Sequence, residues 1–246
     1  MADAILPAAR SQTPALYPEV SKDSLNIHLI AIGGTGMAPL ACLLKGLGHR
    51  VRGSDGPLYP PMSTLLEQAG IEPMVGYDPS HLQPVPDLVV VGNAVPRDNK
   101  EAVETERLGL HRLSMPETLA RFFLQQRRPL VVAGTHGKTT TSAMLAWILE
   151  QSELDPSYLI GGLPSWNRRG FRLGEGSHLV IEGDEYNSAF FDRGPKFLHY
   201  RPHVFMINPV EFDHADLYPN LEAVLTAFRA GAAQVPRTGA VVANAW

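Results

Sequence analysis

The sequence predicts an α/β protein of two domains, each built around a parallel β-sheet. Three observations lead to this prediction. Short apolar segments of strand length alternate with segments of helical pattern along the chain. Two apolar segments run directly into glycine-containing turns, at Gly33 and at Gly134. The 246 residues are also enough for two compact units, each with its own hydrophobic core.

The first domain is predicted over residues 25–127, after a flexible tail at residues 1–24. It opens with a strand, a glycine turn and a helix that ends at Gly48. The alternation of strands and helices then continues, which favours a parallel, Rossmann-like sheet. The expected elements are strands at 26–32, 50–54 and 87–91, and helices at 37–47, 63–69 and about 116–124.

The second domain is predicted over residues 128–246, because the polar run 125–129 interrupts the pattern just before the next apolar strand. The sequence ends at Trp246, directly after a strand, where a parallel sheet would ordinarily turn into another helix. We therefore expect this domain to be incomplete. Its expected elements are strands at 130–133, 158–160, 177–182, 197–200, 204–208 and 240–243, and helices at 139 to about 151 and 221–233.

The turn that follows the strand at 130–133 carries the strongest functional signal. Its glycines let backbone amides approach an anion closely, and the helix behind it adds unpaired N–H groups and its positive dipole end. Lys138 is expected to hold the β- and γ-phosphates of a nucleotide triphosphate, and the Thr139 hydroxyl to bind Mg²⁺. Val132 stands where the usual phosphate loop has its first glycine, so this loop is a shorter variant; a glycine turn that caps an ordinary helix is the alternative. The candidate ATP-binding residues are Gly134, Thr135, His136, Gly137, Lys138, Thr139 and Thr140.

Two later strand ends offer candidate metal ligands. Glu182 ends an apolar strand and is followed by two further carboxylates, and a hard oxygen ligand of this kind suits Mg²⁺. A solvated acidic loop is the alternative for this segment. His214 lies between Asp213 and Asp216 after the next strand, which favours metal or phosphate contact over a structural role.

The glycine turn of the first domain predicts a diphosphate-binding loop. Ala31-Ile32-Gly33-Gly34-Thr35-Gly36 is similar to a dinucleotide fingerprint whose first glycine is replaced by alanine, and Asp55 lies where such folds hold a ribose hydroxyl. A generic turn remains possible, and both a nicotinamide cofactor and a nucleotide-sugar diphosphate would suit the loop. The candidate ligand-binding residues are Gly33, Gly34, Thr35, Gly36, Met37, Ser54, Asp55 and Asn93.

Composition narrows the classes of partner. The net charge of −4 is spread without long blocks of one sign, so neither nucleic acid nor a membrane is expected as a partner. Cys42 is the single cysteine, which excludes an internal disulfide and suits a reducing compartment. With no apolar run of signal-peptide or membrane-spanning length, we expect a cytoplasmic enzyme. The sequence leaves the oligomeric state open.

Taken together, three segments resemble the Mur ligase family in order and spacing: the phosphate loop, the run Glu182-Gly183-Asp184-Glu185 and the turn Asp213-His214-Ala215-Asp216. Members of this family are ATP-dependent, amide-forming enzymes of bacterial cell-wall synthesis. The resemblance covers the chain from about Asn26, and it implies that the first domain binds the UDP part of the substrate and that the second is the ATP-binding central domain. It further implies Lys138 and His214 as catalytic residues, Thr139 and Glu182 as ligands of one Mg²⁺, and His214 as a ligand of a second.

Segments 59–64, 92–94 and 190–200 are most similar to those family members that attach a recycled murein tripeptide, L-alanyl-γ-D-glutamyl-meso-diaminopimelate, to UDP-N-acetylmuramate. The implied reaction is attack of the lactyl carboxylate on the γ-phosphate, followed by attack of the tripeptide amine on the resulting acyl phosphate. Because family members continue into a third domain, the chain is expected to be an N-terminal portion that is inactive alone. The L-alanine-adding members are the nearest alternative, a non-catalytic nucleotide-sugar-binding module comes next, and an NAD-dependent oxidoreductase is the most distant.

Overall fold

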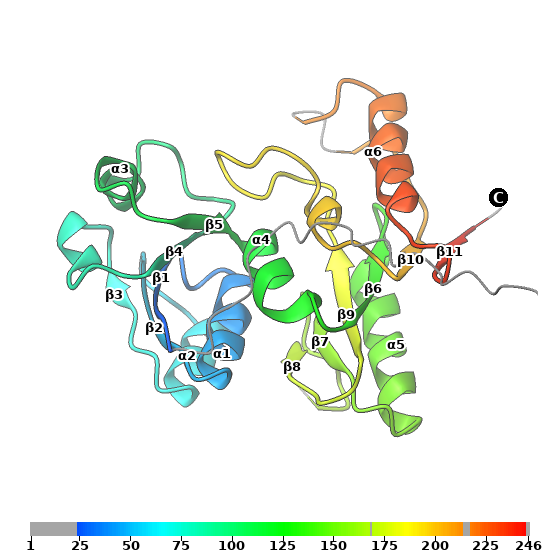
Figure 1. Cartoon of the computed structure of the whole chain (residues 1–246), viewed down its shortest axis with the longest axis horizontal. Coiled ribbons are helices and arrows are strands. Elements are labelled where there is room, and N and C mark those ends of the chain that lie inside the picture. Colours follow the sequence, from blue (N-terminus) through cyan, green and yellow to red (C-terminus); the bar gives the residue numbers. More distant parts are fainter. Residues whose placement is uncertain (1–23, 168, 214–216, 245–246) are drawn as a thin grey trace, which may run out of the picture.

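The computed structural model describes residues 24–167, 169–213 and 217–244, and it divides their strands between two sheets (Figure 1). The first sheet has the order β3-β2-β1-β4-β5, and every neighbouring pair in it is parallel. This order is that of a Rossmann-like sheet: successive strands are added on one side of β1 and then, from β4 onward, on its other side. The strands are β1 (Asn26–Ile30), β2 (Arg50–Asp55), β3 (Met74–Val75), β4 (Leu88–Val91) and β5 (Arg112–Ser114).

The second sheet has the order β11-β10-β6-β9-β7-β8. Only the β7–β8 pair is antiparallel among the pairs that the structure describes here, and the others are parallel. The expected α/β class with parallel sheets is therefore confirmed. The strands are β6 (Arg128–Ala133), β7 (Ser157–Leu159), β8 (Phe171–Arg172), β9 (His178–Gly183), β10 (Val204–Ile207) and β11 (Ala240–Ala243).

Helices cover both faces of the first sheet, and the side chains of β1 alternate accordingly. Ile27 and Leu29 pack in one apolar cluster with Leu40 and Leu44 of α1, whereas Ile30 packs in another cluster with Ala102 of α3. A strand buried on both faces is apolar at nearly every position, which is why these strands were recognisable in the sequence. The helical elements of this half are α1 (Met37–Gly46), α2 (Met62–Gln68), the short 3₁₀ helix η1 (Pro79–Leu82) and α3 (Lys100–Arg107).

One apolar cluster continues from the first sheet into the second. It extends from α1 through Leu119 of α4 (Met115–Leu119) and Phe123 of the π-helical turn η2 (Ala120–Leu124) to Val131 of β6. On the second sheet, α6 (Leu221–Ala233) contributes Phe228 to this cluster, while α5 (Lys138–Gln151) contributes Ala146 to a separate one. The two sheets are thus joined by packed side chains.

Polar contacts add to this packing between the two halves. Ser114 caps α4 in a capping box with Glu117, and its hydroxyl also donates to Asp192 Oδ2 at 2.7 Å. The Arg112 guanidinium lies 4.6 Å from the ring centroid of Phe191, close enough for a cation–π contact. The loop that contains Phe191 and Asp192 is therefore held against β5 and α4.

The expected strand at 197–200 is wrong, because this segment forms the 3₁₀ helix η3 (Lys196–His199). Pro195 precedes the turn and accepts a hydrogen bond from the backbone N–H of Leu198. Phe197 is fully buried and lies 5.4 Å and 5.3 Å, between ring centroids, from Phe205 and Phe228. A short apolar run can be buried as a turn as well as a strand, and periodicity alone does not separate the two.

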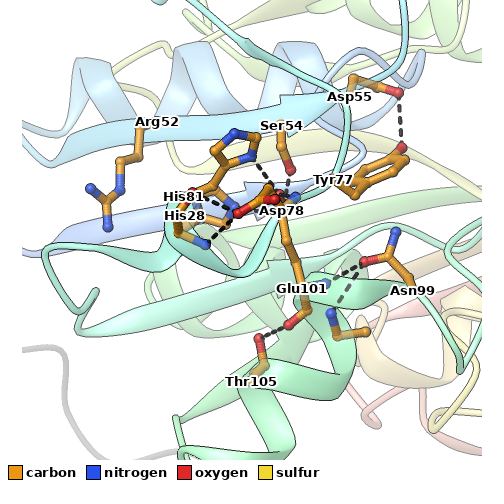
Figure 2. A network of polar contacts seen from close by, with 12 residues as sticks. His28, Arg52, Ser54, Asp55, Tyr77, Asp78, His81, Asn99, Glu101 and Thr105 are labelled. Atoms are coloured by element: carbon orange, nitrogen blue, oxygen red, sulfur yellow. Dashed lines mark hydrogen bonds and ion pairs between the residues drawn. The ribbon is translucent and has the colours of Figure 1, made fainter.

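A buried charged network underlies the first sheet (Figure 2). Glu101 of α3 is fully buried, and its carboxylate contacts His28 Nε2 at 2.9 Å and His81 Nδ1 at 2.8 Å. It also accepts hydrogen bonds from the Ser54 hydroxyl and the backbone N–H of Asp78. Burial raises the pKa of the Glu101 carboxyl, but hydrogen bonds from His28, Ser54 and His81 lower it more, so its pKa lies below the ordinary value.

No helix within the described ranges is long and apolar enough to cross a lipid bilayer.

Glu101→Ala is expected to destabilise the fold by about 3–5 kcal/mol at pH 7, because it leaves several buried polar partners unpaired. Chemical unfolding followed by circular dichroism measures this change. Glu104→Ala is the matched control, since Glu104 lies on the same helix and pairs with the exposed Arg107; its effect should be much smaller.

Comparison of the wild type with Glu101→Ala also gives a prediction for the pH dependence of stability. A carboxyl whose folded-state pKa is lowered contributes stability above its ordinary pKa of 4.5 and loses it as the pH falls through the folded value. The difference in unfolding free energy between wild type and Glu101→Ala should therefore be full at pH 7 and should shrink below pH 4.5. A difference that stays constant down to pH 3 would show that packing, not charge, explains the loss.

Candidate active site

The loop between β6 and α5 adopts a backbone that requires glycine at two positions. Gly134 has φ +127° and Gly137, the residue before α5, has φ +77°. A Cβ atom at Gly134 would lie only 2.7 Å from Cβ of Asn208. These two glycines therefore let the loop curl closely against the end of β10, in front of the N-terminus of α5.

The end of β10 braces this loop. Asn208 Nδ2 donates to the carbonyl of His136 and to the hydroxyl of Thr141, both at 3.1 Å. The backbone N–H of Thr135 donates to the carbonyl of Pro209 at 3.0 Å, and the N–H of Glu211 donates to the Thr135 hydroxyl at 2.9 Å. The loop is thus fixed by the neighbouring strand, as an anion-binding loop must be if its amides are to converge.

Lys138 is the first residue of α5, and its ammonium group lies back over the loop. It donates to the carbonyl of Gly134 at 2.7 Å and to Glu185 Oε2 at 2.9 Å. The Lys138 side chain is only 13% exposed, and Glu185 is buried beside it. The ammonium group is therefore positioned at the loop by two acceptors, in a site where its charge is weakly screened.

Thr139 and Glu182 come together as the sequence predicts. The Thr139 hydroxyl donates to Glu182 Oε2 at 3.1 Å, and the backbone N–H of Gly161 donates to Glu182 Oε1 at 2.7 Å. Burial raises the pKa of the Glu182 carboxyl; the hydrogen bond from Gly161 lowers it, and the charge of Asp184 raises it further. A partly buried carboxylate beside a threonine hydroxyl is a donor set that fits Mg²⁺, whose charge would offset the cost of burial.

His214, expected to bind a second Mg²⁺, lies outside the described residues, so its role stays a prediction. Its neighbour Asp213 is exposed at the end of the segment that follows β10. His136, within the phosphate loop, is exposed, and its Nε2 lies 3.4 Å from Glu211 Oε2. Such an exposed pair contributes little stability.

The glycine turn after β1 is held by Asp55, at the end of β2. The backbone N–H of Gly33 donates to Asp55 Oδ2 at 2.7 Å, and the Tyr77 hydroxyl donates to Oδ1 at 3.0 Å. A Cβ atom at Gly33 would lie 2.9 Å from Asp55 Oδ2, so this close approach needs glycine. Ala31 replaces the first glycine of the fingerprint and still adopts φ +64°, a conformation that costs an alanine free energy and that is common at binding sites. Asp55 therefore shapes the loop itself, and its contact with a ribose hydroxyl stays a prediction.

The other predicted residues of the first domain separate into exposed and buried groups. Gly34, Thr35 and Asn93 are exposed beside the turn. Met37 is buried at the start of α1, and the fully buried Ser54 directs its hydroxyl to Glu101 (Figure 2). Ser54 therefore supports the turn from beneath through the buried network.

A cavity of about 240 Å³ lies between the glycine turn after β1 and the first turn of α5. Its walls include Thr35 and Gly36 from the first half of the chain and Thr139 and Glu182 from the second. A larger cavity of about 510 Å³ also contacts Thr35, and it extends between α2 and the segment that leads from β7 to β8. The volume of this larger cavity suits a small-molecule ligand.

Two protein-family profiles match the chain. The profile described as "Mur ligase family, catalytic domain" matches residues 26–127, and "Mur ligase middle domain" matches residues 132–245. Among solved structures, the UDP-N-acetylmuramate:L-alanyl-gamma-D-glutamyl-meso-diaminopimelate ligase from Neisseria meningitides superposes with a TM-score of 0.87 at 42% identity, over 91% of this chain and 72% of that one. The chain belongs to the Mur ligase family.

Two curated Mur ligases illustrate the range of similarity. The UDP-N-acetylmuramate–L-alanyl-gamma-D-glutamyl-meso-2,6-diaminoheptandioate ligase of Escherichia coli (strain K12) is 47% identical over 218 residues, which are 89% of this chain and 48% of that protein. The UDP-N-acetylmuramate–L-alanine ligase of Pelotomaculum thermopropionicum is 39% identical over 219 residues, which are 89% of this chain and 45% of that protein. The chain thus spans about half the length of the curated relatives it matches.

The structure adds three residues that the sequence prediction did not assign to the site. Glu185 holds Lys138, Asn208 braces the phosphate loop, and Lys196 lines the 240 Å³ cavity. Glu185 and Asn208 lie in segments that the sequence marks as polar strand ends, so a signal for them existed. Lys196 had no such signal, since it follows β9 by a long loop and reaches the cavity only because η3 folds back onto the sheet.

In this Mur ligase, Glu182→Gln is expected to raise the melting temperature at pH 7 in the absence of metal. A carboxyl whose folded-state pKa is raised loses stability on ionisation, and the neutral amide removes that cost while its oxygen can still accept a hydrogen bond. The same substitution should remove most of the stabilisation that Mg²⁺ with an ATP analogue gives to the wild type. Differential scanning fluorimetry measures both effects. Glu175→Gln, at an exposed carboxylate, is the control and should change neither; an unchanged response of Glu182→Gln to Mg²⁺ would exclude Glu182 as a ligand.

Proposed function

We propose that the chain is the nucleotide-binding part of a cytoplasmic, ATP-dependent carbon–nitrogen ligase of peptidoglycan recycling. The complete enzyme would join L-alanyl-γ-D-glutamyl-meso-diaminopimelate to UDP-N-acetylmuramate. The ligation is proposed for a protein of the relatives' length, and we expect this chain to bind both nucleotides without completing turnover alone.

The shared cavity is the observation that carries this proposal. A ligase of this class must bring the carboxylate of the sugar nucleotide to the γ-phosphate of ATP. The glycine turn after β1 supplies Thr35 and Gly36 to the lining of this cavity, and the first turn of α5 and β9 supply Thr139 and Glu182. A ligand diphosphate at the first loop and a triphosphate at the second would thus direct their reacting ends into the same space.

The roles of the residues follow from their contacts. Lys138 would neutralise charge on the β- and γ-phosphates, and the convergent N–H groups at the start of α5 would bind phosphate oxygens. Thr139 and Glu182 would hold Mg²⁺, which when bound offsets negative charge on the transferred phosphoryl group. The expected reaction passes through an acyl phosphate of the lactyl carboxylate, because a free carboxylate is a poor electrophile toward an amine. The protein's contribution is positioning and electrostatic stabilisation.

Sequence similarity favours the tripeptide over L-alanine as the acceptor. The Escherichia coli relative, whose name specifies the tripeptide, shares 47% of aligned residues, whereas the Pelotomaculum thermopropionicum relative, whose name specifies L-alanine, shares 39%. Mass spectrometry of the product that the full-length protein forms with each acceptor tests this part of the proposal. A product with L-alanine and none with the tripeptide would reverse the assignment.

Isothermal titration of this chain tests the binding part. UDP-N-acetylmuramate and a non-hydrolysable Mg-ATP analogue should each bind to the wild type. Lys138→Met should weaken the ATP analogue by about 10- to 100-fold, the value of one hydrogen bond to a charged group, and should leave the sugar nucleotide unchanged. Binding of the sugar nucleotide without any binding of the ATP analogue would favour a nucleotide-sugar-binding module over a ligase.

A further inference from the structure

Lys196 is a nearly buried cation on the wall of the 240 Å³ cavity. It begins η3, and its side chain is only 9% exposed. The same cavity is bounded by Gly36 of the first domain and by Glu182 of the second. Among the described residues that line it, Lys196 is the only one with a basic side chain.

Asp184 and Tyr186, which follow the end of β9, hold the Lys196 side chain in place. The ammonium nitrogen lies 2.9 Å from Asp184 Oδ2 and 3.3 Å from the Tyr186 hydroxyl oxygen. It also lies 4.3 Å from the centroid of the Tyr186 ring, and the Tyr186 hydroxyl donates to Asp184 Oδ2 at 2.8 Å. The backbone N–H of Lys196 donates to the carbonyl of Asp184 at 2.9 Å, which ties η3 to the end of β9.

These contacts leave the ammonium group able to bind a further anion. An ammonium group has three N–H donors, and the contacts to Asp184 and Tyr186 use two of them. The cavity already holds the carboxylates of Glu182 and Asp184, which would repel an incoming carboxylate. The Lys196 ammonium group, which is paired with Asp184, offsets that repulsion, and its low exposure strengthens its attraction for an anion.

We propose that Lys196 is a substrate-binding residue whose ammonium group holds the lactyl carboxylate of the sugar nucleotide between the Gly36 turn and Glu182. This inference rests on the proposed function, which brings that carboxylate into the cavity. It adds a residue that discriminates between sugar nucleotides with and without the lactyl group, before any acceptor binds.

Two ligands that differ only in the lactyl group separate this role from a structural one. UDP-N-acetylmuramate carries the carboxylate, and UDP-N-acetylglucosamine lacks the lactyl ether but is otherwise the same. Dissociation constants of both ligands are measured by isothermal titration for the wild-type chain and for Lys196→Met. We expect Lys196→Met to raise the dissociation constant of UDP-N-acetylmuramate by about tenfold or more. The dissociation constant of UDP-N-acetylglucosamine should change by less than about twofold.

The outcomes are distinct. Equal weakening of both ligands by Lys196→Met, or equal affinities of the wild type for both, would overturn the role of Lys196 while leaving sugar-nucleotide binding intact. Failure of the wild type to bind either ligand would overturn the proposed function, and this inference with it.

Three further variants serve as controls for the effect of Lys196→Met. Lys100→Met removes an exposed lysine at the start of α3, away from the cavity walls, and should bind both ligands as the wild type does. Lys196→Arg keeps the charge and should retain part of the preference for UDP-N-acetylmuramate. If Lys196→Met does not fold, Lys196→Gln keeps a polar partner for Asp184 and Tyr186 and carries the same comparison of two ligands.

Discussion

The carboxyl ends of two parallel sheets meet at one cavity, and each functional assignment depends on this meeting. In each sheet, the loops that follow the parallel strands lie at the carboxyl ends of those strands, which is where α/β proteins bind their ligands. The continuous apolar cluster through α4 and the hydrogen bond from Ser114 to Asp192 hold the two sheets together. Without that contact, Gly36 and Glu182 would belong to separate sites, and transfer between two bound nucleotides would have no common space.

Both loops that we propose to bind ligands are held in the same way, by a polar side chain from the end of an adjacent strand. Asp55 of β2 accepts from the N–H of Gly33 in the turn after β1, and Asn208, directly after β10, donates to the carbonyl of His136 in the turn after β6. Each loop also contains a residue with positive φ: Ala31 in the first loop and Gly134 in the second. Such loops are organised before a ligand arrives, which lowers the entropic cost of binding. The buried Glu101 network adds to this support, since Ser54, the residue before Asp55, donates a hydrogen bond to Glu101 (Figure 2).

The parts of this structure that could be predicted from sequence are those set by local rules. Strands buried on both faces, such as β4, are continuous apolar runs, and the phosphate loop has glycine and lysine at fixed spacing. The pairing of Thr139 with Glu182 was predictable because strand ends of one parallel sheet share an edge. Phe197 was misassigned to a strand because its burial comes from contacts with Phe205 and Phe228, which are distant in sequence. The role of Glu185 beside Lys138, and the position of Lys196, likewise depend on tertiary contacts that no local pattern records.

The most direct test of the central claim is a crystal structure of this chain with UDP-N-acetylmuramate, Mg²⁺ and a non-hydrolysable ATP analogue bound together. Our account predicts that the lactyl carboxylate and the γ-phosphate both lie in the cavity bounded by Gly36, Thr139 and Glu182, with Mg²⁺ on the Thr139 and Glu182 oxygens. Two nucleotides bound on separate surfaces, with their reacting groups facing away from each other, would contradict it.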